Sequence, residues 1–211
     1  MQRANLHTAA TGQALLDAAE EIAAGNGLEA VSVRAVAARA ATTTRAVYSL
    51  FGSKDGLVDG LAARAYKVIE NALDDHPRTD DPVEDLVRFA IDGFRPFVLE
   101  HTVLFRIAFQ RLVPDLRVTD ELLDARRRTM RRFAERLQRL QDRGLLGDKS
   151  IQQATFEYNA MCQGLANIEL GGNTVRVFPE GREEDVWRTA FSTLVRSFGV
   201  VVDQDTRAYG S

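Results

Sequence analysis

The sequence has few of the residues that build disulfides, metal sites or membrane spans. Its 211 residues include one cysteine, Cys162, which excludes an intrachain disulfide framework and a cysteine-rich zinc site. The three histidines are scattered, so we expect no metal. No apolar run has the length of a membrane span, and the first ten residues lack the apolar stretch of a signal peptide. We therefore expect a cytoplasmic protein that does not contact membranes.

The residue patterns of common enzymes are also missing. The sequence has no glycine-rich phosphate loop, no nucleophile elbow and no metal-binding triplet. Two acidic pairs, Glu20-Glu21 and Asp74-Asp75, are expected on a polar helix face and at a helix end, where carboxylates are common. We therefore expect neither an enzyme nor a cofactor.

Proline is scarce and alternating strand patterns are nearly absent, whereas helical spacing of apolar residues recurs along most of the chain. This predicts an all-α fold of about nine helices. Ser32, Ser53 and Asp81 are suited to be helix N-caps, and Asp81 is followed by a proline that favours the first helical position. Residues 74–82 form a predicted loop. The helix after it has two apolar stripes, which is typical of a helix inside a bundle.

Local charge is more informative than total charge. The whole chain carries 27 basic and 30 acidic residues, a net charge of -3, which gives no support for nucleic-acid binding. Residues 31–54, however, contain Arg34, Arg39, Arg45 and Lys54 and no acid. Two short helices are predicted there, separated by a few residues, which is the helix-turn-helix layout. A basic solvated surface on an ordinary helical hairpin explains the charge equally well.

Family resemblance favours the first interpretation. The stretches Ser32-Val33-Arg34-Ala35-Val36-Ala37 and Ala46-Val47-Tyr48-Ser49-Leu50-Phe51-Gly52-Ser53-Lys54-Asp55-Gly56-Leu57 resemble the N-terminal domain of the TetR family of transcriptional regulators. The similarity covers about residues 11 to 65. It implies a three-helix DNA-binding domain, assigned to residues 1–56, and a ligand-binding and dimerisation domain, assigned to residues 57–211. There are departures from the family pattern: Ala41 and Arg45 replace common glycines, and Leu50 replaces a common aromatic.

The resemblance also implies which residues contact DNA. A hydroxyl side chain caps the second helix near the backbone, an arginine on that helix reaches a base or phosphate, and the recognition helix faces the groove. A tyrosine and a lysine contact phosphates. The corresponding residues here are Ser32, Arg34, Thr43, Thr44, Arg45, Tyr48, Ser49 and Lys54.

The second half resembles C-terminal domains of the same family more weakly, through the run Gln163-Gly164-Leu165-Ala166-Asn167-Ile168-Glu169-Leu170. The resemblance implies a homodimer joined by the last two long helices, with interface candidates Leu165, Ile168, Trp187, Phe191, Leu194 and Phe198. It also implies a pocket for a small molecule. The candidate lining residues are Phe89, Phe97, Phe105, Phe109, Met130, Phe133, Asn159, Cys162 and Gln163. Each aromatic could instead fill the core.

The sequence thus predicts a ligand-responsive repressor that binds a palindromic operator as a homodimer and is released by a small hydrophobic molecule. The alternative is a helical small-molecule-binding protein that does not act on DNA. We interpret the arginine-rich run from Arg126 to Arg132 as a solvated helix face rather than as a second polyanion site. Met130, Phe133 and Leu137 already define a buried side of the same helix.

Overall fold

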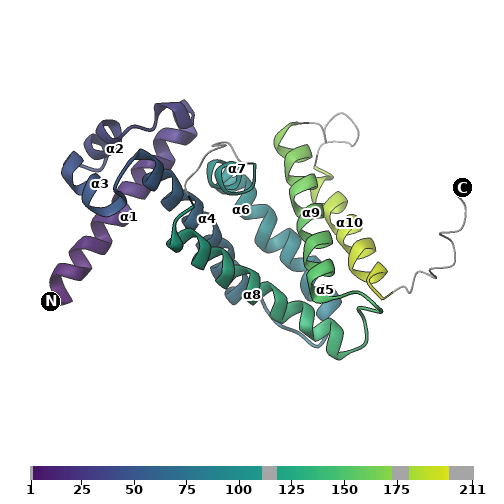
Figure 1. The fold of residues 1–211 in the computed structure, drawn as a ribbon. Helices are drawn as coiled ribbons and strands as arrows, with labels where there is room; N and C mark the ends of the chain where they lie inside the picture. The colour runs from purple at the N-terminus through teal and green to yellow at the C-terminus, as the bar shows by residue number, and fades with distance from the viewer. Residues whose placement is uncertain (1, 111–117, 173–180, 200–211) are drawn as a thin grey trace, which may run out of the picture. The chain divides into compact units, whose positions relative to one another are not determined.

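The computed structural model describes residues 2–110, 118–172 and 181–199, with side chains from residue 8 onward, and every regular element among them is a helix. The all-α prediction is therefore confirmed. Figure 1 labels the elements in chain order. Their bounds are α1 (Gln2–Asn26), η1 (Leu28–Ala30), α2 (Val33–Arg39), α3 (Thr44–Phe51), α4 (Lys54–Asp75), α5 (Pro82–Arg88), η2 (Phe89–Phe94), α6 (Arg95–Glu100), α7 (Thr102–Phe109), α8 (Asp120–Asp142), α9 (Ile151–Leu170) and α10 (Glu183–Ser197). In this described part, no helix is long and apolar enough to cross a membrane.

The chain folds into two compact units. The first unit comprises Met1–Asn71 and Phe97–Thr129, and the second comprises Ala72–Pro96 and Met130–Ser211. Helices α4, α6 and α8 contribute residues to both units. This division describes packing and does not test the functional boundary expected after residue 56, which stays a prediction.

Side-chain caps set most of the predicted helix starts. The Ser32 hydroxyl accepts a hydrogen bond from the Ala35 amide (3.2 Å), and the Ser53 hydroxyl accepts one from Gly56 (3.0 Å). Asp81 caps α5 through the amides of Val83 and Glu84. Thr11 is also a plausible N-cap from the sequence, but α1 begins earlier, at Gln2. Residues 2–10 contain neither glycine nor proline, so nothing in them interrupts the helix.

The core of the first unit joins α1, α2, α3 and α4. Leu15 of α1, Val36 of α2, Val47 of α3 and Leu57 of α4 each have no exposed surface. In Figure 1, α2 and α3 lie beside α1, in agreement with the packing of all three helices on one another. The buried residues of the short helices α2 and α3 therefore fix which of their sides is left for solvent.

The turn between α2 and α3 contains a strained alanine. Ala41 has φ of 49°, the sole positive φ of a non-glycine residue in the described part of the chain. A left-handed alanine costs about 1–2 kcal/mol because its Cβ crowds the following carbonyl, whereas glycine adopts this conformation freely. The resemblance to a family with glycine in this turn is thus matched by a backbone that suits glycine.

We therefore expect Ala41→Gly to raise the free energy of unfolding by about 1 kcal/mol. The matched control is Ala40→Gly, because Ala40 has φ of -79° and gains nothing from glycine's freedom. Urea unfolding should show stabilisation by the first change and a loss of about 0.5–1 kcal/mol by the second. Equal losses in both variants would show that the turn is not strained.

Aromatic side chains link the helices of the second unit. Phe89 of η2 lies 6.3 Å from Phe133 of α8, Phe133 lies 4.7 Å from Tyr158 of α9, and Tyr158 lies 4.7 Å from Phe191 of α10, all between ring centroids. Trp187 stacks beside Phe191 at 5.7 Å. These rings are buried, so this chain of aromatics forms the core of the unit.

The predicted long helix after Pro82 is interrupted by a π-helical segment, η2. Gly93 allows it: a Cβ atom there would lie 2.7 Å from the Phe89 ring. The sequence signal for helix was right, but the wider turn could not be predicted, because a π-helical segment is a single turn inserted within α-helix and is too short to show a spacing of its own.

Two arginines, the buried Arg136 of α8 and the half-buried Arg95 of α6, are tied by hydrogen bonds to neighbouring elements of the second unit. Arg136 donates to the carbonyls of Leu73, His76 (2.7 Å) and Pro77 (3.3 Å) at the end of α4. Arg95 donates to Glu169 of α9 at 2.6 Å, and Glu169 also accepts from the Trp187 indole of α10 at 2.8 Å. Glu169, which belongs to the family-like run of the second half, therefore joins three helices.

Candidate nucleic-acid interface

All the predicted DNA-contacting side chains are exposed. They belong to the N-cap and first turn of α2, to α3 and its N-cap, and to the first residue of α4, and comprise Ser32, Arg34, Thr43, Thr44, Arg45, Tyr48, Ser49 and Lys54. We call this set the α2–α3 surface. Tyr48 is 57% exposed, although tyrosine is a large, mostly apolar side chain. An exposed aromatic with a hydroxyl tip suits a contact with a partner better than it suits water.

The sides of α3 are sharply divided. Val47 is fully buried against the first unit's core, while Thr44, Arg45, Tyr48 and Ser49 face outward. Thr43 is the N-cap, and its hydroxyl accepts a hydrogen bond from the Ala46 amide (3.2 Å). That bond orients the first turn of α3. Thr43 is therefore partly a structural residue, and Thr44 and Arg45 are the better placed side chains for a partner.

Residues 31–54 offer fewer unpaired charges than the sequence suggests. Arg39 forms an ion pair with Glu21 of α1 at 2.7 Å, which the absence of acids in residues 31–54 could not reveal. Within the described residues, Arg34, Arg45 and Lys54 form no ion pair. Three unpaired cations remain around α3, with no acid in the same segment to repel a phosphate.

The predicted ligand-binding residues are distributed over both units. Phe97, Phe105 and Phe109 belong to the first unit, where the rings of the last two stack at 5.5 Å. The second unit contains Phe89, Met130, Phe133, Asn159, Cys162 and Gln163. Phe89, Phe133 and Cys162 are buried, whereas Met130, Asn159 and Gln163 are partly exposed. Their role in binding a small molecule stays a prediction.

Cys162 is fully enclosed in this core. Burial raises the pKa of its thiol well above the ordinary value, so the reactive thiolate is disfavoured. The neighbouring Tyr158 hydroxyl donates to the Leu86 carbonyl at 2.8 Å, and burial raises its pKa well above the ordinary value as well. These properties are those of a small buried apolar residue rather than of a redox sensor.

The predicted dimer contacts need correction. Trp187, Phe191 and Phe198 have at most 1% exposed surface in a single chain, because they already pack within the second unit. A side chain with no free surface cannot be covered by a partner, so these three are core residues. Leu165 and Leu194 are partly exposed and Ile168 is 45% exposed, which leaves them free for such a contact.

Sequence patterns missed the most exposed aromatic among the described residues of the second unit. Phe156 of α9 is 75% exposed, and Ala160, Gly164 and Ile168 follow it at four-residue steps on the same exposed side. We call this set the α9 stripe. The signal that could have revealed this stripe is a large apolar residue among polar neighbours, followed by small or apolar residues at every fourth position. α9 and α10 lie side by side in Figure 1, and α10 covers the opposite, buried side of α9.

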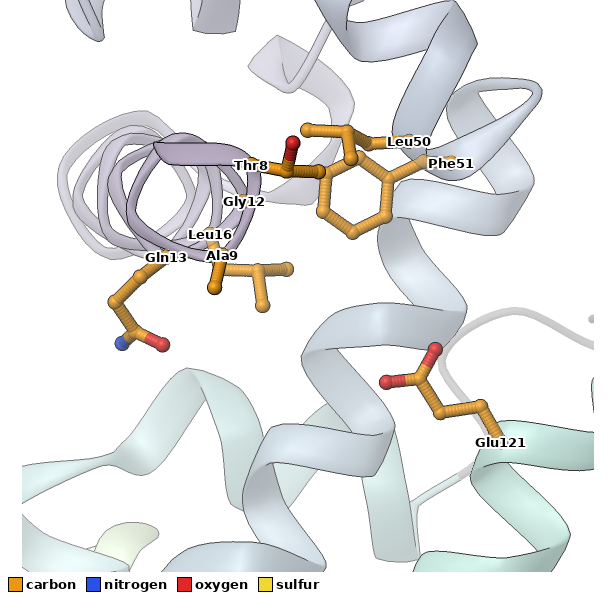
Figure 2. A pocket seen from close by; sticks show the side chains of 8 residues that line it. All are labelled: Thr8, Ala9, Gly12, Gln13, Leu16, Leu50, Phe51 and Glu121. Carbon is orange, nitrogen blue, oxygen red and sulfur yellow. The ribbon is translucent and has the colours of Figure 1, made fainter. Parts of the chain in front are cut away.

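A hollow of about 410 Å³ opens within the first unit between α1, α3 and α8 (Figure 2). Its lining residues are Thr8, Ala9, Gly12, Gln13, Leu16, Leu50, Phe51 and Glu121. No sequence motif pointed to it, because its walls come from helices far apart along the chain.

Family models match most of the chain. The model described as "Bacterial regulatory proteins, tetR family" matches residues 15–61, and the model described as "Tetracyclin repressor-like, C-terminal domain" matches residues 87–194. No curated protein sequence matches the chain.

Solved structures share the fold over nearly their whole length. A protein of unknown function from Rhodococcus sp. RHA1 is similar with a TM-score of 0.72 and 20% identity, over 90% of this chain and 96% of that one. The TetR family regulator PfmR from Thermus thermophilus is similar with a TM-score of 0.60 and 23% identity, over 86% and 97%. GusR from Salmonella enterica gives a TM-score of 0.68 at 17% identity, over 88% and 95%. At these identities the similarity shows the fold.

Proposed function

Because the chain belongs to the TetR family of bacterial transcriptional regulators, we propose that it is a ligand-responsive repressor. In this proposal a homodimer binds a palindromic operator through the α2–α3 surface of each chain. A small hydrophobic molecule binds the domain formed by residues 57–211, and the protein then leaves the DNA. The domain of residues 1–56 supplies the DNA contacts.

One observation carries the proposal. Every predicted DNA-contacting side chain is exposed around α3, and Arg34, Arg45 and Lys54 are unpaired among the described residues. A helix of this length fits the major groove, and its first turn offers a threonine methyl for thymine and a guanidinium for guanine. Tyr48, on α3 itself, and Lys54, at the start of α4, are suited to contact phosphates.

The test is selection of a preferred duplex from a randomised palindromic pool, followed by fluorescence anisotropy with that duplex and a scrambled one. We expect the preferred duplex to bind at least about a thousand-fold more tightly, as for other sequence-specific proteins. Equal affinity for both duplexes would contradict operator recognition. No binding at low salt would favour the alternative, a helical ligand-binding protein that does not act on DNA.

We propose that the α9 stripe forms the dimer contact. Phe156 supplies an exposed aromatic anchor, and the small residues Ala160 and Gly164 let a partner helix approach closely. A Cβ atom built on Gly164 meets nothing within 4 Å in the single chain, so the space next to it is open. Two reading helices on a two-fold axis also match the symmetry of a palindrome.

Phe156→Lys is expected to weaken dimerisation by about 2–3 kcal/mol, which is roughly a 30- to 150-fold rise in the dimer dissociation constant. The control is Gln138→Lys, which adds the same charge at an exposed position of α8. Sedimentation equilibrium measures both. A native protein that stays monomeric at every concentration contradicts the dimer. If Phe156→Lys leaves the dimer dissociation constant unchanged, the interface does not include the α9 stripe.

The effector proposal is tested by native mass spectrometry of the purified protein. A bound molecule that can be extracted, identified and added back should lower the affinity for the selected duplex. The largest effect it can have equals the ratio of its affinities for free and DNA-bound protein. A molecule that binds without changing DNA affinity would contradict its role as an effector.

A further inference from the structure

We propose that the hollow between α1, α3 and α8 binds an amphiphilic cation, a molecule with a hydrocarbon body and an ammonium group. This site lies in the first unit and shares no residue with the candidate effector-binding set. Its regulatory consequence depends on the proposed DNA binding, but the binding itself does not.

The walls of the hollow are apolar where a hydrocarbon would lie. Leu16 of α1 and Leu50 and Phe51 of α3 present half-buried apolar side chains, and Figure 2 shows the Phe51 ring edging the hollow. Ala9 and Gly12 of α1 are small and leave the space open. A volume of about 410 Å³ is within the range of small-molecule sites.

The charge at the hollow is a single carboxylate. Glu121, in the first turn of α8, points toward the space between α1 and α3 in Figure 2. The structure shows no hydrogen bond or ion pair of Glu121 with any described residue. The other polar side chains, Thr8 and Gln13, are uncharged. An ammonium group is therefore attracted and an anion is repelled.

An adjoining hollow of about 280 Å³ shares Gln13, Leu16 and Glu121 but has a different character. It adds three cationic side chains, Arg64, Lys67 and Arg128, which are engaged by acids. Arg64 pairs with Asp17 at 2.6 Å, and Lys67 pairs with Glu70 at 3.0 Å. These cations disfavour an ammonium group there, so the ammonium group lies on the α3 side of Glu121, next to the apolar walls of the larger hollow.

The occupant would bear directly on the DNA-reading helix. Leu50 and Phe51 are the last two residues of α3, and Glu121 is on α8. A molecule that contacts both joins the recognition helix to α8 within the first unit. It therefore favours one placement of α3 over others and shifts DNA affinity by the difference in its affinity for those placements.

The first experiment is isothermal titration of the full-length protein with decyltrimethylammonium, below its critical micelle concentration and without DNA. Decyl sulfate and decyl maltoside provide the anionic and neutral probes with the same chain. We expect the cation to bind at least five-fold more tightly than either. Equal affinity for all three, or no binding, overturns the proposal.

Variants locate the site. Glu121→Gln keeps the shape of the side chain and removes its charge. It should lower the affinity for the cation about five-fold and leave the affinity for decyl maltoside unchanged. Asp120→Asn removes a neighbouring exposed charge that does not line the hollow, and should have less than a two-fold effect. If both variants lower the affinity for the cation equally, the overall negative charge at the start of α8 is responsible and the proposed site is refuted.

Filling the hollow is the second arm. Gly12→Leu should abolish binding of all three probes, whereas Gly12→Ala adds a Cβ atom only 4.0 Å from Leu50, an ordinary contact, and should preserve it. Thermal unfolding confirms that both variants fold. Methyl chemical shifts of Leu16 and Leu50 must move with the cation and stay still in Gly12→Leu. Binding that survives in Gly12→Leu places the probe elsewhere and overturns the assignment.

Discussion

The Arg45→Ala variant is expected to bind the selected duplex about 10- to 100-fold more weakly and to lose its preference at one base pair of each half-site. Arg45 is exposed in the first turn of α3 and has no ion pair among the described residues. A guanidinium that donates two hydrogen bonds to guanine contributes about 1–3 kcal/mol of discrimination. Competition binding with a panel of duplexes, each substituted at one position, measures this effect.

Lys54→Ala and Tyr48→Phe provide the contrast. Tyr48 is exposed on α3 and Lys54 is exposed at the start of α4, and both are proposed to contact phosphates, which are present in every DNA sequence. Each change should lower the affinity for every duplex by a similar factor and leave the order of preference among duplexes unchanged. If Arg45→Ala also lowers all affinities uniformly, Arg45 does not read a base and the assignment of α3 as the reading helix fails.

Arg136→Leu is expected to lower the free energy of unfolding by about 3–5 kcal/mol. The Arg136 guanidinium is buried, donates to three carbonyls at the end of α4, and lies 5.8 Å from the centre of the Phe89 ring. Leucine preserves much of the apolar contact but leaves those carbonyls without donors, at about 1–3 kcal/mol for each that stays buried. Urea unfolding of the native and variant proteins gives the difference.

The control for this prediction is Arg132→Leu, one helical turn earlier on α8. Arg132 is exposed and pairs with Asp74 at 3.3 Å at the surface, an interaction worth about 1 kcal/mol or less. Similar losses in the two variants would mean that arginine in α8 stabilises the helix itself rather than closing the end of α4.

The arginine-rich run shows where sequence patterns suffice and where they fail. The apolar spacing on α8 predicts its buried side, and the exposure of Arg126, Arg127 and Arg128 agrees with a solvated face. Arg136 follows the same composition and yet is buried. Nothing local marks it, because its acceptors are carbonyls at the end of another helix, and backbone groups leave no signature in the sequence.

Local chemistry predicted the short helices that carry the α2–α3 surface more fully than it predicted the surface of the dimer contact. Capping by Ser32 and Ser53 depends on neighbours within three residues, so the starts of α2 and α4 follow from the sequence. The predicted dimer residues Trp187, Phe191 and Phe198 are apolar for a different reason, the core of their own chain. An apolar stripe alone does not tell whether the same chain or a partner covers it.

The hollow and the Arg39–Glu21 pair were beyond sequence patterns for a related reason. Both join α1 to later elements of the chain: the ion pair joins it to α2, and the hollow lies between it, α3 and α8. The relevant distances depend on packing among helices, and no spacing rule along one helix contains them.

The salt dependence of binding to the selected duplex tests the central claim most directly, namely that cationic side chains around α3 contact DNA phosphates. Plotted as the logarithm of the association constant against the logarithm of salt concentration, the native protein should give a steep negative slope. Lys54→Ala should reduce the magnitude of that slope by about 1 for each chain of the bound dimer, since each lysine releases about one counterion. An unchanged slope in this variant, with affinity retained at every salt concentration, would contradict the account.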